Sequence, residues 1–318
     1  MRTNFETDLF SDAAKNNSKT VTPIHISGVL KLAEIPIPWL IDNLLIQGGC
    51  SLLAAKPKVG KTTFSRCLAL AVARGEPFLG QNTIKREVLL MTLEDKLSEV
   101  GRHFRQLGAC DDEGIFVLTE SPRSIPQLRL LISEKKFGLV IIDTMILGVR
   151  GLMDLNDYLQ VSQAVAPYVQ LARETDSHIM FVHHLSKRER GGGDQILGST
   201  ALFGSVDSVL LLDRQKQIRT FSTIMRYGKD WSLARLTMTD AGRIELGEEF
   251  DEETTITSQI LESLTSVGRP VTEKEIESFV SGRTSEKRKS LRQLLQQGLI
   301  SRNGTGSRNS PYLYSSRP

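Results

Sequence analysis

The residues best suited to chemistry form the short run Gly60-Lys61-Thr62, inside the segment SLLAAKPKVGKTT at residues 51–63. An apolar stretch typical of a strand precedes this run, and a stretch with helical periodicity follows it. Glycine, lysine and a hydroxyl residue in that context are typical of a Walker A loop. Successive backbone N–H groups and the positive end of the following helix bind phosphate oxygens there. The run therefore predicts a nucleoside triphosphate site.

In that loop Lys61 would reach the β- and γ-phosphates of ATP, and the Thr62 hydroxyl would coordinate Mg²⁺. The pattern GxxxxGK[ST] requires glycine where this chain has Ala55. Alanine is the smallest substitute, so the loop can close if that residue does not need a positive φ. The substitution leaves open a lower affinity for the nucleotide. The alternative interpretation of the whole run is a basic surface turn that contains Gly-Lys-Thr. The predicted nucleotide-binding residues are Ala55, Lys56, Pro57, Lys58, Val59, Gly60, Lys61, Thr62 and Thr63.

Acidic side chains end two further apolar runs. Asp143 closes the run FGLVIIDT at residues 137–144, the form of a Walker B strand, and would hold Mg²⁺ through water. An aspartate that caps the next helix is the alternative. Glu94 and Asp95 close the run VLLMTLED at residues 88–95, and Glu94 is the candidate that activates the attacking water. Asp95 could instead cap a helix near Lys96, and spacing alone leaves the two roles open.

The elements that must position these residues alternate along the chain. Strands that are apolar throughout are buried on both faces, which predicts a mostly parallel sheet between helices, a doubly wound α/β domain. We therefore expect a RecA-like P-loop core. The strand-type and helix-type stretches fall at residues 50–54, 63–72, 88–92, 96–107, 115–118, 125–134, 139–143, 157–174, 178–183, 209–213 and 219–225.

Composition divides the chain into four parts. Residues 1–34 are polar and predict a flexible arm, and residues 35–247 form the expected ATPase domain. At its start, IPIPWLIDNLLIQ predicts an extended segment anchored by Trp39. Residues 248–256 are acidic and predict a linker, and residues 257–318 predict three helices followed by a hairpin, a winged helix-turn-helix. The capping pattern TEKE begins its second helix at Thr272.

Whole-chain properties exclude several classes. The 318 residues include 40% hydrophobic and 24% charged residues, as in ordinary soluble proteins. No apolar run approaches the roughly 18 residues of a membrane span, and the first residues lack a signal-peptide core, so we expect a cytoplasmic protein without a membrane partner. The cysteines Cys50, Cys67 and Cys110 are scattered, which argues against disulfides and zinc.

With these motifs in order, the chain resembles the RepA-like branch of the RecA/DnaB superfamily, AAA-type ATPases and hexameric replicative helicases of plasmids, phages and other mobile elements. The resemblance covers residues 36–246. The family pattern PWLxDxLL matches residues 38–45, and KPKxGK[ST] matches residues 56–62. The resemblance also implies that Glu94 is the catalytic carboxylate.

The resemblance implies further roles. His183 or His184 would sense the γ-phosphate, although a pair of histidines could also be structural or bind a metal. The run RERGGGDQILGSTAL at residues 188–202 would be a mobile loop that contacts single-stranded DNA in a ring, with a ligand-free surface loop as the alternative. Arg226 and Lys229 lie where the family carries residues that reach the neighbouring subunit's nucleotide, which implies a homo-hexamer.

The carboxyl-terminal module carries the chain's basic excess. From residue 257 onward there are 10 Lys/Arg and 5 Asp/Glu, against a net charge of +3 for the whole chain. Arg302 and Arg308 flank a Gly/Ser-rich turn that could act as a wing on phosphate. Alternatively, such a module could bind another protein instead of DNA. The basic residues that could bind duplex DNA from a recognition helix are Lys287, Arg288, Lys289 and Arg292.

Together these patterns predict a Mg²⁺-dependent ATP hydrolase, a hexameric helicase or translocase on single-stranded DNA in the replication of a mobile element. Three alternatives stay open. The first is a recombination or loading ATPase whose assembly on DNA is switched by ATP. The second is a regulator whose winged helix reads an operator. The third is a RecA-like signalling ATPase that ignores nucleic acid.

Overall fold

The computed structural model divides into two compact units, Met1–Pro38 and Trp39–Pro318. In the part of the chain that the model describes, no helix is both long and apolar enough to cross a membrane. Residues 1–21 of the expected arm, residues 188–199 of the expected DNA loop, and Arg308 lie outside the described residues. The described residues are 22–152, 157–185, 200–215, 218–247, 252–280, 282, 284–307 and 310–316.

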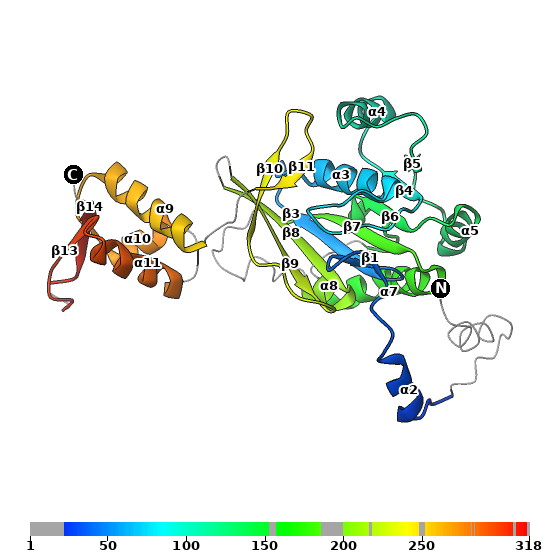
Figure 1. Cartoon of the computed structure of the whole chain (residues 1–318), viewed down its shortest axis with the longest axis horizontal. Helices are drawn as coiled ribbons and strands as arrows, with labels where there is room; N and C mark the ends of the chain where they lie inside the picture. The colour runs from blue at the N-terminus through cyan, green and yellow to red at the C-terminus, as the bar shows by residue number, and fades with distance from the viewer. Residues whose placement is uncertain are drawn as a thin grey trace. The chain divides into compact units, whose positions relative to one another are not determined.

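A nine-stranded sheet forms the centre of the larger unit (Figure 1). Its order is β11-β10-β9-β8-β3-β7-β6-β4-β5, and the neighbours from β8 to β5 run parallel. β9, β10 and β11 extend the sheet as antiparallel strands. The strands are β3 (Cys50–Ala55), β4 (Val88–Thr92), β5 (Ile115–Leu118), β6 (Leu139–Asp143), β7 (His178–His184), β8 (Ser208–Gln215), β9 (Ile218–Met225), β10 (Ala234–Met238) and β11 (Ile244–Leu246).

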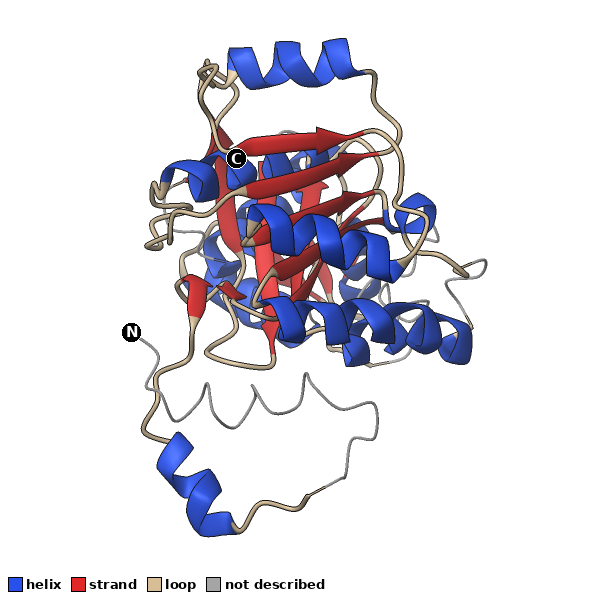
Figure 2. Ribbon diagram, turned by 90° about the vertical axis from the view of Figure 1, so that its right-hand side faces the viewer, coloured by secondary structure: helices blue, strands red, loops and turns tan. Residues whose placement is uncertain are grey.

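Helices cover both faces of this sheet, as Figure 2 shows. α3 (Lys61–Arg74) and α4 (Leu97–Gln106) pack in one apolar cluster with alternate residues of the strands. α5 (Ile125–Lys135) and α7 (Tyr158–Thr175) pack in a second cluster with the residues between. Side chains alternate between the two faces along a strand, and both faces of this sheet are covered by an apolar cluster. The strands must therefore be apolar throughout. The expected doubly wound α/β core is confirmed.

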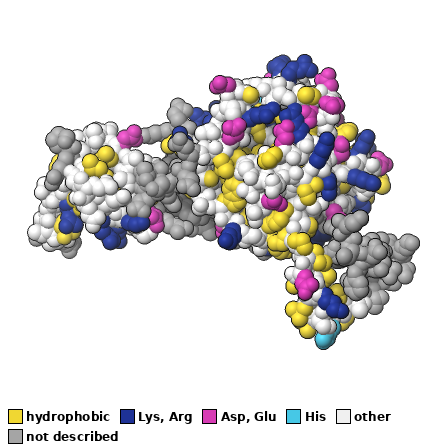
Figure 3. Space-filling view, in the orientation of Figure 1, with side chains coloured by type: hydrophobic (Ala, Val, Ile, Leu, Met, Phe, Trp, Pro, Cys, Tyr) yellow, Lys and Arg dark blue, Asp and Glu magenta, His cyan; other side chains and the backbone are white. Residues whose placement is uncertain are grey.

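The amino-terminal unit contains one described helix, α2 (Ile26–Leu32), where the sequence predicted a flexible arm. Every residue of α2 is at least partly exposed, and Leu30 is 62% exposed. Figure 3 shows apolar side chains on the surface of this unit. The apolar positions in ISGVLKL recur at helical spacing, which accounts for a helix in this segment. The interpretation as a polar arm overlooked that spacing.

Several short elements were not expected from the sequence. The segment expected to be extended and anchored by Trp39 contains a two-stranded sheet of β1 (Trp39–Ile41) and β2 (Leu45–Ile46). The chain also forms α6 (Met145–Gly148), α8 (Thr200–Ser205) and the β10–β11 hairpin. These pieces have at most six residues, too short to show a period, and tertiary contacts decide their conformation.

The carboxyl-terminal residues form their own apolar cluster. A three-stranded antiparallel sheet has the order β12-β14-β13. The predicted capping box is confirmed, because the Thr272 and Glu275 side chains and backbone bond reciprocally. α9 starts at Glu252, inside the segment expected to be a linker, since acidic residues are favourable at a helix amino terminus. The elements are α9 (Glu252–Val267), β12 (Val271–Thr272), α10 (Glu273–Phe279), α11 (Thr284–Gln296), β13 (Ile300–Asn303) and β14 (Leu313–Ser316).

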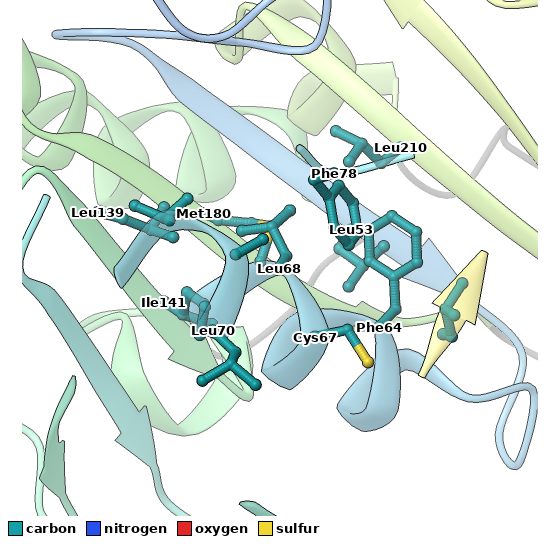
Figure 4. Close-up of a cluster of buried hydrophobic side chains, with 14 of the residues drawn as sticks. Leu53, Phe64, Cys67, Leu68, Leu70, Phe78, Leu139, Ile141, Met180 and Leu210 are labelled. Atoms are coloured by element: carbon teal, nitrogen blue, oxygen red, sulfur yellow. The ribbon is translucent and has the colours of Figure 1, made fainter. Parts of the chain in front are cut away.

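The core under α3 holds the phosphate-binding region in place (Figure 4). Phe64, in the first turn of α3, stacks on Phe221 of β9 with ring centroids 5.4 Å apart. It also meets the edge of Phe78 at 5.2 Å. Aromatic pairs of this kind contribute about 0.5–1.5 kcal/mol beyond their buried area. The helix that follows the loop is therefore fixed at its amino end, which is the end that would face phosphate.

Candidate active site

The phosphate-binding loop, the two acidic motifs and the histidine pair lie at the carboxyl ends of four adjacent parallel strands. Ala55 ends β3 and pairs in register with His184 of β7, and Ala54 pairs with His183. Asp143 ends β6 beside Val182 of β7 and pairs with Thr92 of β4. The carboxyl edge of a parallel sheet is where α/β proteins bind ligands. The strand order thus brings together motifs that are up to about 130 residues apart in the sequence.

The loop between β3 and α3 has the backbone of an anion-binding nest. Lys58 has φ +64° and Gly60 has φ +118°, both in the left-handed region. Left-handed residues among right-handed ones turn successive N–H groups inward toward one point. Gly60 is also the amino-terminal cap of α3, so the positive end of the helix dipole is aimed at that point. Only glycine tolerates the φ of Gly60 without strain.

Ala55, the departure from the glycine pattern, lies within β3 rather than in the tight part of the loop. Its φ is not among the positive values, and its side chain is fully buried in the apolar cluster under α3. An alanine at this position therefore needs no special backbone conformation. The loop closes through Lys58 and Gly60 instead.

Lys61 is a buried ammonium group at the start of α3, 5% exposed. Its Nζ donates to the carbonyl oxygens of Ala55 at 2.9 Å and Lys56 at 3.2 Å. Burial lowers the pKa of Lys61 to about 8, and the nearby carboxylates of Asp143 and Glu94 oppose this shift. A group that loses hydration to this degree gains by contact with a phosphate, which would replace the carbonyls as the acceptor.

Asp143 is a largely buried carboxyl group with two carboxylates and two cations nearby. Burial raises the pKa of Asp143 to about 6, the carboxylates of Asp95 and Glu94 act in the same direction, and Arg66 and Lys61 partly oppose them. A divalent cation would relieve this repulsion. The Thr62 hydroxyl and the Asp143 carboxylate are oxygen ligands of the kind Mg²⁺ prefers when water and phosphate complete its shell. These residues therefore fit the metal expected from the sequence.

Glu94 lies in the exposed segment between β4 and α4, where a bound nucleotide could reach it. Its Oε1 accepts a hydrogen bond of 3.0 Å from Oγ1 of Thr144, the residue after Asp143. Asp95, its neighbour, pairs with Nη2 of Arg66 on α3 at 2.5 Å. The two acids, which the sequence could not distinguish, therefore have different partners. Glu94 faces the end of β6, while Asp95 is held by the phosphate-binding helix.

The histidine pair at the end of β7 divides between core and surface. His183 is buried, and burial lowers its pKa to about 4, with the positive neighbours His184 and Lys61 acting in the same direction. His184 is exposed, and burial of part of its ring lowers its pKa as well. β7 lies between β3 and β6, and side chains alternate between the faces along a strand. His184 therefore shares the α3 face of the sheet with Val182, whereas His183 shares the opposite face with Phe181.

Arg226 and Lys229 follow the end of β9, at the opposite end of the strands from the phosphate-binding loop. Arg226 follows β9, whose end pairs with the start of β8, and its backbone N–H donates to Asp207 next to the start of β3. Its Nη1 pairs with the Asp207 carboxylate at 3.2 Å, and Nη2 donates to the Gly204 carbonyl. At about 3.3 Å per residue, the length of β3 separates this point from Ala55 by roughly 16 Å. The Arg226 guanidinium is therefore held away from the phosphate-binding loop of the same chain.

One cation beside the loop was missed by sequence reasoning. Arg219 of β9 donates from Nε to the Val59 carbonyl at 3.3 Å, and it is the nearest group to the space beside Gly60. It is a single arginine in an antiparallel strand, which carries no motif. Only the pairing of β9 with β8 and of β8 with β3 places it at the phosphate-binding loop.

The basic residues of α11 are mostly engaged within the carboxyl-terminal module. Lys287 is 7% exposed, and its Nζ donates to the Glu277 carbonyl at 2.9 Å. Arg288 pairs with Glu273 at 2.6 Å and lies 3.9 Å from Glu277. Lys289 also has an interaction partner, and Arg292 is exposed. Arg302 lies over the Tyr312 ring at 4.3 Å within the β13–β14 hairpin.

Fold and site together define a P-loop ATPase core of the RecA-like kind. A family model described as an AAA domain matches residues 26–190, which is half of the chain, and the chain belongs to that family. Among solved structures, one described as an ATPase domain is similar, with a TM-score of 0.51 and 18% identity. The match covers 77% of this chain and 98% of that one, and it shows the shared fold. No curated protein sequence matches the chain.

Proposed function

We propose that this protein is a Mg²⁺-dependent ATP hydrolase that assembles into a homo-hexameric ring and acts as a helicase or translocase on single-stranded DNA in the replication of a mobile element. The observation that supports hydrolysis is the meeting of Lys61, Asp143 and Glu94 around one sheet edge. Phosphate binding, charge compensation and water activation each have a residue there.

In this proposal the backbone of the loop and Lys61 bind the β- and γ-phosphates. The Thr62 hydroxyl and, through water, the Asp143 carboxylate would hold Mg²⁺, which would supply positive charge beside the phosphates. Glu94 orients the attacking water and accepts its proton. The Thr144 hydroxyl donates to Oε1 of Glu94 and so holds this carboxylate next to the end of β6. In the same proposal His183 or His184 senses the γ-phosphate, which is supported by the position of both histidines at the carboxyl end of β7.

The assignment of Arg226 and Lys229 as trans-acting residues is supported by their position. Arg226 lies near the amino-terminal end of β3 through its contact with Asp207, and Lys229 follows it in the same connection between β9 and β10. Arg226 is also occupied by Asp207, so Lys229, which is exposed, is the better candidate to reach a neighbouring nucleotide. A ring would complete each site with a cation from the next subunit.

A direct test is steady-state ATP hydrolysis by the full chain with Mg²⁺, at low salt, with and without single-stranded DNA, with Lys61→Ala as the control. Strong stimulation by the strand, absent in the variant, is expected for a DNA-dependent motor. Turnover that ignores DNA would overturn the helicase proposal and favour the signalling ATPase. DNA-stimulated turnover without unwinding of a forked duplex would favour a recombination or loading ATPase.

The ring can be tested by mixing two inactive variants, Lys61→Ala and Lys229→Ala. If Lys229 acts on the next subunit, mixed rings contain some interfaces with an intact loop on one side and an intact lysine on the other. Activity should then return on mixing, with a dependence on the ratio of the two variants. Failure of any mixture to recover activity, although Lys229→Ala alone is inactive, would contradict the trans role.

A winged-helix interpretation of residues 257–318 is supported by the order of three helices and a hairpin around a small sheet. The regulator alternative requires this module to read duplex DNA with α11. The burial of Lys287 and the pairing of Arg288 with two glutamates weaken that alternative. We propose that the module contributes auxiliary DNA or partner contacts rather than operator recognition.

A further inference from the structure

We propose that Arg66 is a positioning residue for hydrolysis, because its buried guanidinium holds Asp95 and thereby fixes the segment that carries Glu94. This inference rests on the proposed ATPase function. Arg66 lies on α3 one turn beyond Thr62, and its side chain is 5% exposed. The same helix therefore carries the phosphate-binding groups at its first turn and the anchor of the water-activating acid at its second.

The contacts of Arg66 use its forked shape. Nη2 pairs with Oδ2 of Asp95 at 2.5 Å, and Nη1 lies 2.7 Å from Nδ1 of His103 on α4. Arginine has only donors, so Nδ1 of His103 must accept and the ring is neutral with its proton on Nε2. Burial and the charge of Arg66 lower the pKa of His103, in agreement with a neutral ring. Lysine, a point charge, could not make both contacts in this geometry.

The segment that Arg66 holds needs an anchor. Its ends are fixed by the backbone, where Leu93 N–H donates to the Asp143 carbonyl at 2.8 Å and the Lys96 carbonyl accepts from the start of α4. Between these ends Glu94 and Asp95 are both exposed, and side-chain contacts locate them. Thr144 locates the Glu94 carboxylate, and Arg66 locates the adjacent residue through Asp95. A catalytic group must be held within about 0.5 Å of its productive position.

Stability alone is a weak reason for this pair. Taking a guanidinium out of water is costly, and a buried ion pair is often no more stabilising than apolar residues of similar volume. Asp95 remains 41% exposed, which weakens its attraction further through solvent screening. Because Asp95 is next to Glu94, the ion pair of Arg66 and Asp95 can position Glu94, which an apolar contact could not do.

The test compares two variants that each remove one partner of Arg66 from the full chain. Asp95→Ala frees the Glu94 segment and should lower kcat for ATP about 10- to 100-fold, with KM changed less than about 3-fold, since misplacement by about 1 Å has effects of this size. His103→Ala is the matched control, which should lower Tm similarly but leave kcat within about 2-fold. Arg66→Met, which removes the guanidinium itself, should reproduce the Asp95→Ala effect. Equal kcat in all of these variants would overturn the proposal.

A double-mutant cycle separates positioning from a direct role of Asp95. In a Glu94→Gln background the further change Asp95→Ala should have little effect, because the group it positions is already disabled. If Asp95 were itself the base, Glu94→Gln would keep most turnover and Asp95→Ala would abolish the rest. If Glu94→Gln alone leaves turnover intact, the proposed function of Glu94 fails, whatever Arg66 does.

Amide hydrogen exchange gives a readout that does not depend on turnover. Exchange in residues 93–96 should accelerate in Arg66→Met and Asp95→Ala, while exchange in β3 and β6 stays unchanged. His103→Ala should accelerate exchange in α4 only. Faster exchange in α4 without change in residues 93–96 would show that Arg66 serves only to attach α4, and would overturn the positioning role.

Discussion

Two buried lysines show how differently the ATPase core and the carboxyl-terminal module use charge. Lys61 is 5% exposed and Lys287 is 7% exposed, and each donates to a backbone carbonyl. Lys61 lies at a sheet edge where Asp143 and Glu94 gather, and its pKa is lowered by burial. Lys287 instead binds the Glu277 carbonyl near the end of α10, where a cation favours the helix dipole. The first is positioned for a ligand and the second completes the fold.

The same contrast extends to the neighbouring ion pairs. In the core, Arg66 is buried and links three elements around the candidate base. In the module, Arg288 pairs with Glu273 and Arg269 pairs with Glu275, all at the surface. Exposed pairs of this kind contribute little to stability and are screened by salt. Burial of a charged group, with the pKa shift that burial causes, is therefore a better guide to a candidate active site than the number of basic residues is.

Replacing each buried lysine by methionine should separate the two regions most strongly. Lys61→Met should lower ATP turnover at least about 100-fold, because a donor to the transferred phosphoryl group is lost. Its Tm should stay the same or rise, since a poorly hydrated charge is removed. Lys287→Met should leave turnover unchanged but lower the stability of the module. Steady-state hydrolysis and calorimetry of both full-length variants would check this, and a loss of turnover in Lys287→Met would break the comparison.

A pH titration tests the neutral buried histidines of the core. Burial lowers the pKa of His178 to about 4, and its ring bonds Ile46 and Ser51. The unfolded chain binds a proton below about pH 6.5 while folded His178 stays neutral, so stability falls as pH falls from about 6.5 to 4. The loss from His178 between about pH 7.5 and 5 should be about 2 kcal/mol.

His183 contributes to the same pH dependence with the same sign, so His178→Asn should reduce the slope rather than abolish it. Urea unfolding followed by tryptophan fluorescence is suitable, because both tryptophans, Trp39 and Trp231, lie in the ATPase core. An unchanged slope in His178→Asn would contradict the assignment.

DNA binding by the full chain should respond more to an exposed arginine of α11 than to a paired one. Arg292→Ala should weaken binding about 3-fold at low salt and reduce the salt dependence by up to about one counterion. Arg288→Ala should have a smaller effect because its charge is already paired with glutamates. Fluorescence anisotropy over a range of salt would measure both, and equal effects would remove the distinction.

The smallest effect is expected at Ala55. Ala55→Gly restores the usual glycine pattern but should leave the KM for ATP within about 2-fold, since φ there does not require glycine. The folded state should lose about 0.5–1 kcal/mol, because glycine inside a strand costs conformational entropy. A large gain in nucleotide affinity would show that alanine does limit the loop.

The strand and helix that carry the candidate site residues could be predicted from local sequence patterns. Asp143 ends an apolar strand and Lys61 follows a strand and begins a helix, so both positions could be predicted from a few neighbours. The partners of those residues are not local. Arg66 lies 29 residues from Asp95, and Arg219 lies 160 residues from Val59, so only strand order and helix packing bring them together.

The module shows the opposite limitation. Its helices and capping box follow from periodicity and from the TEKE pattern. The basic run of α11 predicted a DNA-binding face, because sequence shows charge without its partners. Burial of Lys287 against α10 depends on how the helices pack. The same packing pairs the exposed Arg288 with glutamates of α10, while Arg292 stays exposed.

The central claim is that a site at the carboxyl ends of the central strands binds ATP through Lys61 and hydrolyses it through Glu94. The most direct measurement compares binding of a fluorescent ATP analogue and steady-state turnover for Lys61→Met and Glu94→Gln in the full chain with Mg²⁺. Lys61→Met should weaken binding and abolish turnover, whereas Glu94→Gln should bind normally and turn over at least about 100-fold more slowly. Normal turnover by Glu94→Gln, or normal binding and turnover by Lys61→Met, would contradict the account.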